Sequence, residues 1–219
     1  MKMISCSHAR QELRRNASPA KARVLKSFFK TGPGEYSEKD IFIGVKVPDI
    51  RRIAAACDRL GPGPVRALLR STVHEERLLA LLILARQYAA GTMRVRKAIV
   101  RTYLTHTSRI NTWDLVDLSA SYILGDWLKD KGRGELVKLA RSRDMWERRI
   151  AIVATHAFIR QGQCRDTFRI AAMLLEDKED LIHKAAGWML REAGKRDIRA
   201  LKAFLKRHEA RMPRTMLRY

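Results

Sequence analysis

Arg77-Leu78-Leu79-Ala80 is the first of four similar segments that decide the fold. The others are Asp114-Leu115-Val116, Arg149-Ile150-Ala151 and Lys184-Ala185-Ala186, so the chain aligns with itself when it is shifted by about 35 residues. Such a period, with two helices per repeat and no clear strand, is typical of HEAT-like repeats. We therefore predict an all-α fold, an α-solenoid of HEAT-like helix pairs with a basic concave face. The alternative is that a helical chain gives this period by chance.

Local signals place the individual helices. Ser18 and Pro19 form a cap followed by proline at the first helical position, and glycine–proline runs break the chain after residues 31 and 60. Residues 36–47 could form a strand, but a lone strand has no partner, so we expect a loop or short helix. The predicted helices run from 19 to about 32, 48–61, a short one to 71, 74–90, 94–106, 113–129, 135–141, 144–160, 165–175, 181–193 and 198–209.

The end of the sequence carries one more helix signal. Pro213 would start a further helix, but the sequence stops six residues later at Tyr219, as in a shortened chain. We expect residues 1–219 to form a single domain, since a chain of 219 residues fits one large domain or two small ones.

The net charge is the strongest signal in the composition. The chain has 45 Lys and Arg against 23 Asp and Glu, a net charge of +22, while 46% of its residues are hydrophobic. Such an excess destabilises a compact chain by self-repulsion unless an anionic partner is usual. Nucleic acid, an anionic membrane and an acidic protein are the possible partners. The membrane is disfavoured, because no run approaches the roughly 18 apolar residues of a spanning helix and the basic residues are spread along the chain.

Cysteines and histidines point away from disulfides and metals. Cys6, Cys57 and Cys164 are far apart, which fits a reducing cytosol. No C-x-x-C, H-E-x-x-H or i, i+4 histidine pair occurs, so we expect neither a metal nor another cofactor. The first fifteen or so residues lack the apolar core of a signal peptide. We therefore expect a cytoplasmic protein that works on the nucleoid.

The segment 112–120 (TWDLVDLSA) combines two carboxylates with a tryptophan. Asn111 or Thr112 can cap this helix, and Asp114 in the first turn suits the helix dipole. Asp117 lies one turn deeper, on the same face as Trp113 and among apolar residues. A carboxylate there is either paired with a base or kept for chemistry, and both explanations stay open at this point.

Aromatic and basic residues on the equivalent helices suggest a nucleic-acid surface. Trp113, Trp146 and Trp188 lie at the start or middle of helices predicted to line the concave face; core packing is the ordinary explanation for each, and stacking on nucleotides is the functional one. Gly187 before Trp188 would let another backbone approach. Candidate phosphate contacts, each of which could also be a solvated charge, are Arg148, Arg149, Lys184, Arg191, Lys195, Arg196 and Arg199.

A carboxylate in such a groove repels DNA and so weakens binding, but it becomes useful if the reaction develops positive charge. Cleavage of an N-glycosidic bond does so, because it passes through an oxocarbenium-like state. At about 4 Å and an effective dielectric near 20, a carboxylate stabilises that state by roughly 4 kcal/mol. This stabilisation corresponds to about a thousandfold in rate. A base already made cationic by alkylation leaves neutral and needs no general acid, so a lone Asp117 could suffice.

Several motifs together resemble the AlkD-type DNA alkylation-repair glycosylases, in the right order over nearly the whole chain. They are Gly44-Val45-Lys46-Val47-Pro48 with Arg51-Arg52, Trp113-Asp114-Leu115-Val116-Asp117, Trp146-Glu147-Arg148-Arg149, Gly187-Trp188-Met189-Leu190-Arg191-Glu192, Gly194-Lys195-Arg196-Asp197, and residues 212–219 (MPRTMLRY).

The resemblance implies a HEAT-like solenoid that cradles duplex DNA as a monomer and excises cationic purines such as 3-methyladenine and 7-methylguanine. It implies that Asp117 is catalytic and that Trp113 and Trp188 contact the DNA backbone. It places the active-site arginine at Arg149, with Arg148 as a one-residue alternative. It also implies that the lesion is not flipped into a deep pocket of the protein. For the N-terminal DNA contact, Tyr36 is our choice.

Two other functions fit the same sequence. A HEAT-like module could bind damaged or branched nucleic acid without chemistry, which tight binding without release of a base would indicate. A solenoid for acidic protein partners is the third possibility, and negligible affinity for DNA at physiological salt would favour it.

Overall fold

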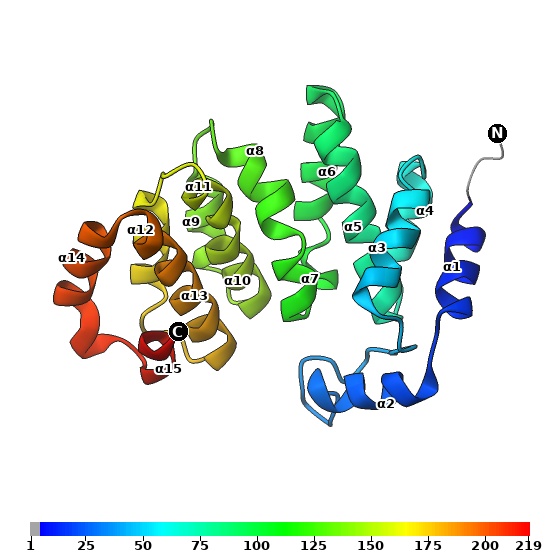
Figure 1. Ribbon diagram of the computed structural model, residues 1–219, viewed down its shortest axis with the longest axis horizontal. Coiled ribbons are helices and arrows are strands. Elements are labelled where there is room, and N and C mark those ends of the chain that lie inside the picture. The colour runs from blue at the N-terminus through cyan, green and yellow to red at the C-terminus, as the bar shows by residue number, and fades with distance from the viewer. Residues whose placement is uncertain (1–4) are drawn as a thin grey trace. The chain divides into compact units, whose positions relative to one another are not determined.

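The computed structural model describes residues 5–219, and most of these are helical (Figure 1). Their only strand-like pairing is an isolated parallel bridge between Ile41 and Val73, so the prediction of an all-α fold is confirmed. The chain divides into two compact units: unit 1 ends at Ser119, and unit 2 comprises Ala120–Tyr219. The HEAT-like repeat and the single domain remain predictions. In the described part of the chain, none of the helices has the length and apolar character that crossing a membrane requires.

Unit 1 is built around a helix that is buried along most of its length. This helix, α5, packs against α3, α4, α6 and α7, and α1 packs against α3, α4 and α5. Residues 78–84 of α5 form a continuous buried apolar run, because helices surround them on all sides. The elements of unit 1 are α1 (Cys6–Arg15), α2 (Pro19–Phe28), α3 (Val47–Ala56), α4 (Pro62–Leu69), α5 (His74–Ala90), α6 (Met93–Leu104), η1 (Thr107–Arg109) and α7 (Trp113–Asp117).

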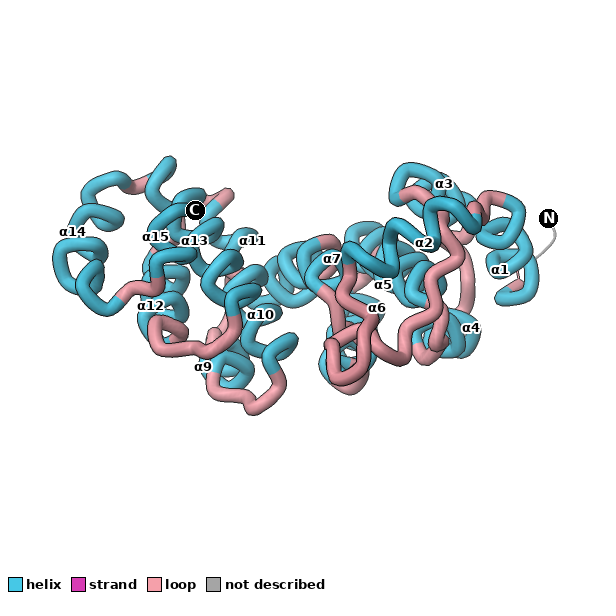
Figure 2. The backbone as a smooth tube through the Cα atoms, turned by 90° about the horizontal axis from the view of Figure 1, so that it is seen from below, coloured by secondary structure: helices cyan, strands magenta, loops and turns pink. Residues whose placement is uncertain are grey.

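Helix α2 lies across the ends of α3 and α5 and is joined to α3 by a long loop (Figures 1 and 2). The amide of Ser18 donates to the carbonyl of Ile43 at 2.9 Å. Gly44 in this loop has φ +79°, and a Cβ built on it would lie 2.2 Å from the carbonyl oxygen of Ser18. Only glycine allows both this backbone conformation and this close approach, so Gly44 fixes where α2 begins.

Unit 2 packs mainly around α13. This helix contacts α10, α11, α12, α14 and α15. A Cβ on Gly187 would lie 2.6 Å from the carbonyl oxygen of Met216, which confirms the prediction that another backbone approaches the chain at this glycine. The elements are η2 (Ser121–Gly125), α8 (Asp126–Leu128), α9 (Gly134–Ala140), α10 (Met145–Ala154), α11 (His156–Ile159), α12 (Arg165–Met173), α13 (Asp180–Arg196), α14 (Ile198–His208), η3 (Glu209–Arg211) and α15 (Arg214–Arg218).

Two predicted long helices are interrupted. The predicted helix 113–129 ends its first α-helical part at Asp117 and continues after a turn as a π-helical turn and α8. The hydroxyl of Ser119 donates to the carbonyl of Leu115, and in the predicted helix 144–160 the hydroxyl of Thr155 donates to that of Ile152. Such side-chain bonds compete with helical ones and bend the chain. Helix α1 was not predicted, whereas α5 has the predicted bounds and residues 36–46 form a loop, as expected, before α3 begins at Val47.

Candidate active site

Unit 1 contains a pocket of about 330 Å³ beside Asp117. Helices α2, α3, α5 and α7 contribute to it, together with Phe29 just after α2, Val45 just before α3 and Leu118 just after α7. Its wall is mostly apolar and includes Phe28, Phe29, Ile50, Leu78, Trp113 and Asp117. Two residues predicted to share one helix face, Trp113 and Asp117, therefore do line one cavity.

Three aromatic rings form one side of this pocket. The indole of Trp113 stacks on Phe29, with ring centroids 5.1 Å apart and planes inclined by 12°. Phe28 meets the same indole edge-on at 5.6 Å and is 62% exposed. Phe29 in turn stacks on Phe42 at 5.2 Å and is buried. Since Phe29 occupies one face of the indole, a ligand can stack on Trp113 only from the other. We call Phe28, Phe29 and Trp113 the aromatic wall.

Asp117 is half-buried and is the last residue of α7. The turn that follows it is held by Ser119, whose hydroxyl lies 3.0 Å from that of the fully buried Tyr103. Burial raises the pKa of the Tyr103 phenol, and the negative charge of Asp117 raises it further. Tyr103 therefore remains a neutral anchor for the C-terminal end of α7.

Four consecutive charged residues, 74–77 (HEER), begin α5, and all four are buried. Each holds a different segment. Arg77 is 1% exposed and forms an ion pair with Asp40 at 2.6 Å. Glu76 pairs with Arg10 of α1 at 2.9 Å. Glu75 accepts hydrogen bonds from the backbone amides of residues 43, 44 and 45, the shortest being 2.7 Å.

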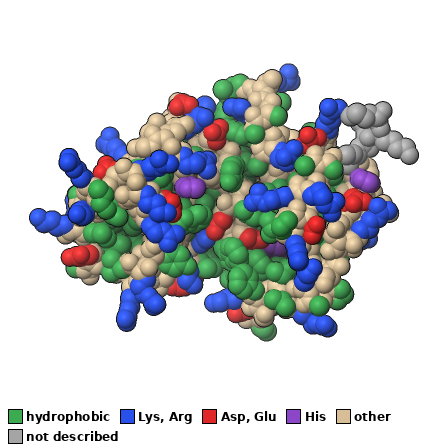
Figure 3. All heavy atoms as spheres, viewed as in Figure 1, with side chains coloured by type: hydrophobic (Ala, Val, Ile, Leu, Met, Phe, Trp, Pro, Cys, Tyr) green, Lys and Arg blue, Asp and Glu red, His purple; other side chains and the backbone are tan. Residues whose placement is uncertain are grey.

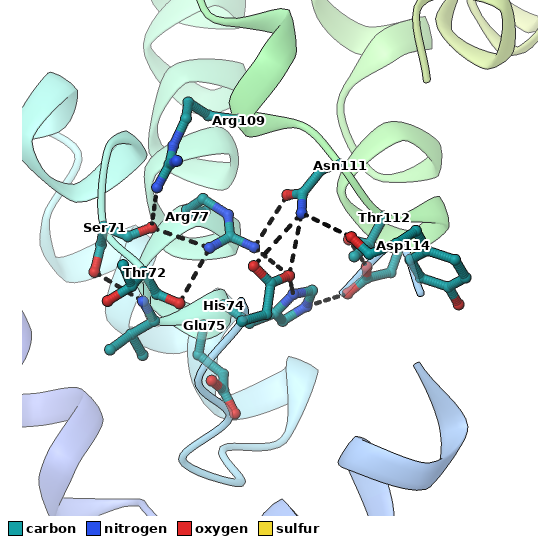
Figure 4. A network of polar contacts seen from close by, with 12 residues as sticks. Ser71, Thr72, His74, Glu75, Arg77, Arg109, Asn111, Thr112 and Asp114 are labelled. Carbon is teal, nitrogen blue, oxygen red and sulfur yellow. Dashed lines mark hydrogen bonds and ion pairs between the residues drawn. The ribbon is translucent and has the colours of Figure 1, made fainter. Parts of the chain in front are cut away.

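His74 extends this network to the segment that carries Asp117 (Figure 4). Its Nε2 lies 2.8 Å from Oδ2 of Asp114, and its Nδ1 lies 3.9 Å from Asp40, within ion-pair distance but beyond a hydrogen bond. The hydroxyl of Thr112 donates to the other carboxylate oxygen of Asp114 at 2.7 Å. Arg77 also donates to Asn111, the residue before Thr112, at 3.1 Å.

The ion pairs of this network set the pKa values of His74 and Asp40. Burial by itself lowers the pKa of His74, but the carboxylates of Asp114 and Asp40 outweigh burial and raise it to about 9. Burial likewise acts to raise the pKa of Asp40, yet the nearby positive charge of His74 and the hydrogen bond and charge of Arg77 leave that pKa lower than usual. At neutral pH, His74 is therefore a buried imidazolium between two carboxylates.

This network corrects two expectations about the Trp113 helix. Thr112 occupies the N-cap position, but its side chain makes no capping bond and donates to Asp114 instead. Asp114 is held by His74, so the helix dipole is not its main partner. Sequence reasoning missed His74, Asp40 and the phenylalanines of the aromatic wall. The available signal was the run HEER at the head of an otherwise apolar helix.

The candidate residues of unit 2 lie on α10 and α13. Trp188 is half-buried, with its ring centroid 5.8 Å from that of His156. Arg149 is buried and donates to the carbonyl of Leu181 in the first turn of α13. Arg148 forms a two-pronged ion pair with Asp177, with nitrogen–oxygen distances of 2.6 and 3.1 Å.

The remaining candidates are more exposed. Lys184 pairs with Asp180 of its own helix at 2.8 Å, and Arg191 is exposed and lies 3.6 Å from Glu192. Tyr36 lies half-buried in the loop between α2 and α3, where its carbonyl accepts from Asn111 at 3.5 Å; it does not line the pocket. Between residues 5 and 219, no cluster of three or more His, Cys, Asp or Glu side chains could hold a metal ion.

The fold and the pocket define an all-α protein with a carboxylate beside an aromatic wall and a charge suited to a polyanion. Comparison with known families shows that the chain belongs to the DNA alkylation repair enzyme family, whose model matches residues 9–219. The structure of a protein described as a predicted DNA alkylation repair enzyme from Enterococcus faecalis is similar, with a TM-score of 0.69 over 93% of this chain and 94% of that one, at 15% identity. This likeness shows a shared fold. No curated protein matches the sequence. The family indicates a role in DNA repair, with DNA as the substrate.

Proposed function

We propose that this protein is a monofunctional DNA glycosylase of the AlkD type that hydrolyses the N-glycosidic bond of alkylated, cationic purines in duplex DNA. 3-Methyladenine and 7-methylguanine are the expected substrates. The observation that carries the proposal is the half-buried Asp117, which lines an apolar pocket next to the aromatic wall in a chain of net charge +22. Family membership supports the reaction class.

In this proposal Asp117 acts on the sugar. As the bond from C1′ to the alkylated base lengthens, its electron pair moves onto the base, which leaves as a neutral molecule. The sugar becomes cationic, and a carboxylate at about 4 Å stabilises it by roughly 4 kcal/mol. Asp117 also orients a water, whose oxygen bonds to C1′ and whose proton passes to the carboxylate and then to solvent. No metal or organic cofactor takes part.

The other titratable side chains that line the pocket are all engaged in contacts within the protein, so we expect none of them to protonate the leaving base. His74 and Asp114 are bonded to each other, and Glu75 is held by three backbone amides. A neutral base needs a proton to leave, whereas a cationic one does not. The proposal therefore confines the enzyme to cationic lesions. The electron-rich faces of the aromatic wall favour the same charge, because they attract cations.

DNA binding in this proposal uses residues of both units. The open face of Trp113 packs on the sugar–phosphate backbone at the lesion, and Trp188 does the same. Arg149 contacts phosphate, with Arg148 as its alternative, and Tyr36 contributes an N-terminal contact. Lys184 and Arg191 supply further positive charge to a monomer on duplex DNA.

Substitution of Asp117 tests the proposal. In Asp117→Asn, we expect a folded protein that binds methylated duplex DNA at least as well as wild type, but releases free base about a thousandfold more slowly, because the stabilising charge is gone. Release is measured under single-turnover conditions. Asp58→Asn is the matched control, since Asp58 is exposed in the same unit and its loss changes net charge equally. Unchanged release by Asp117→Asn would remove Asp117 from the mechanism.

The alternative is a nucleic-acid-binding module without chemistry. The lining of the pocket favours it, because an apolar wall whose polar groups are mostly bonded within the protein would also suit a passive binding site. Tight binding of methylated DNA by wild type without any free base would establish this alternative in place of the glycosylase.

A further inference from the structure

Helix α7 cannot hold its own position. It has five residues, Trp113–Asp117, and its first and last residues are the two on which the proposed function depends. Isolated helices shorter than about 12 residues are marginal in water. The orientation of Asp117 and Trp113 is therefore set by the contacts that α7 makes with the rest of unit 1.

The N-terminal half of α7 is held through Asp114. Its two carboxylate oxygens are taken by His74 at 2.8 Å and by the hydroxyl of Thr112 at 2.7 Å. The imidazole of His74 is 3% exposed, and the carboxylate of Asp114 is 8% exposed. A buried charge-assisted hydrogen bond of this length is among the stronger polar contacts in proteins. The rigid, buried α5 thus supports the first turn of α7.

His74 also touches the aromatic wall. Its ring centroid lies 4.9 Å from that of Phe29, which stacks on the indole of Trp113. It also stacks on Phe42 at 4.7 Å, with an interplanar angle of 26°. One imidazole therefore contacts both the carboxylate that orients α7 and the ring that backs Trp113.

We propose that His74 is a positioning residue for the glycosylase site: through its ion pair with Asp114 and its contact with Phe29, it fixes where Asp117 and Trp113 lie in the pocket. His74 does not touch the reacting atoms. The inference rests on the proposed function for its effect on catalysis, while its effect on α7 stands without it.

Three charged groups from three elements face His74. Asp114 comes from α7, Asp40 from the loop before α3, and Arg77 from its own helix, where it opposes the positive charge of His74. The two carboxylates outweigh Arg77, so the imidazolium form is the one that holds Asp114 at neutral pH. Replacement by a neutral donor of similar size should weaken this support without removing the hydrogen bond.

The test is His74→Gln in the full chain. We expect single-turnover release of 7-methylguanine to slow by about tenfold or more, since small misplacements of a catalytic group reduce rates by factors up to about a hundred. Affinity for the same DNA should change less than about twofold, because His74 lines the pocket with only 2% of its surface exposed. His106→Gln is the matched control. His106 is a second buried histidine of unit 1 and bonds to Arg70 and Thr102.

Hydrogen exchange separates positioning from general stability. The amides of Val116 and Leu118 donate to the carbonyls of Thr112 and Asp114, so their exchange reports on α7. The amide of Arg70, which donates to Arg66 at the end of α4, is the reference. In His74→Gln, relative to wild type, we expect exchange of the two α7 amides to accelerate more than exchange of the reference amide. Equal acceleration at all three amides would overturn the inference. So would unchanged release of free base by His74→Gln when wild type is active.

Asp114→Asn approaches the same link from the other side and replaces His74→Gln if that variant does not fold. The double variant should lose little more than either single one, because both changes weaken the same interaction. Additive losses would overturn the inference. If wild type releases no base, the proposed function fails, but the exchange rates still decide whether His74 positions α7.

Discussion

Two carboxylates three residues apart have different environments. Asp114 is buried, and His74 and Thr112 take its oxygens, whereas Asp117 is half-buried and lines the pocket. Environment rather than residue type assigns roles to such pairs. Here it makes Asp114 a structural partner and leaves Asp117 as the candidate for chemistry.

The raised pKa of His74 predicts how stability depends on pH. Its pKa rises from 6.5 to about 9 on folding, so the native state binds the proton more tightly than the unfolded chain. The contribution of His74 is therefore complete below pH 6.5 and is lost as the pH rises through about 9. It is on the order of 3 kcal/mol in the free energy of unfolding.

Urea unfolding at several pH values measures this. Wild type should lose stability between pH 6.5 and about 9, and His74→Gln should lose much less over the same interval. His106→Gln should follow the wild-type curve. Parallel curves for wild type and His74→Gln would show that the folded chain does not hold the proton on His74.

At the scale of elements, the site depends on where α2 lies. Phe28 and Phe29 stand at its C-terminal end, and the segment 43–45 holds its beginning. That segment is itself held by Glu75 at the head of α5. The aromatic wall is therefore positioned from α5 by two routes, through Glu75 and through His74.

Gly44→Ala tests the route through residues 43–45. The new Cβ would lie 2.2 Å from the carbonyl oxygen of Ser18 and 2.6 Å from the amide nitrogen of Ala22, so α2 must shift. We expect slower base release as well as lower stability. Gly34→Ala is the control, because Gly34 has φ +76° but nothing within 4 Å of a new Cβ. It carries only backbone strain of about 1–2 kcal/mol.

Comparing the two glycine variants isolates the clash. Thermal or urea unfolding should give a larger loss of stability for Gly44→Ala than for Gly34→Ala, and only the former should slow single-turnover release. Equal effects in both assays would mean that the approach of α2 to Gly44 does not position the aromatic wall.

At the scale of the whole molecule, the charge governs binding to DNA. On the face drawn in Figure 3, Lys and Arg side chains are spread over the elements rather than gathered in one patch. Several of the basic candidates are held by acidic neighbours, Arg148 by Asp177 and Lys184 by Asp180. The excess of +22 nevertheless favours any polyanion.

The affinity for DNA should fall steeply with salt. Each phosphate contact contributes about 0.9 to the slope of log affinity against log salt concentration. Lys184→Gln and Arg191→Gln should each reduce this slope by about that amount. Lys97→Gln, on the exposed side of α6, should leave it unchanged. Slopes are measured by titration of fluorescent duplex DNA; equal slopes for all variants would remove Lys184 and Arg191 from the binding surface.

The sequence by itself determined the all-α class, the bounds of α5, the close approach at Gly187 and the shared face of Trp113 and Asp117. Helical periodicity, glycine positions and i, i+4 spacing are local properties, so one chain segment suffices to read them. It also determined the net charge, which no fold can alter.

Only the tertiary structure decided the partners. HEER looks like a polar helix start, and its burial depends on α1, the loop before α3, and α7 meeting around it. The aromatic wall joins residues about 85 positions apart, Phe28 and Trp113. The breaks after Asp117 and at Thr155 depend on hydroxyl bonds that compete with a strong helical pattern. Contacts between distant segments leave no periodic trace in the sequence, because each partner is placed by the packing of the others.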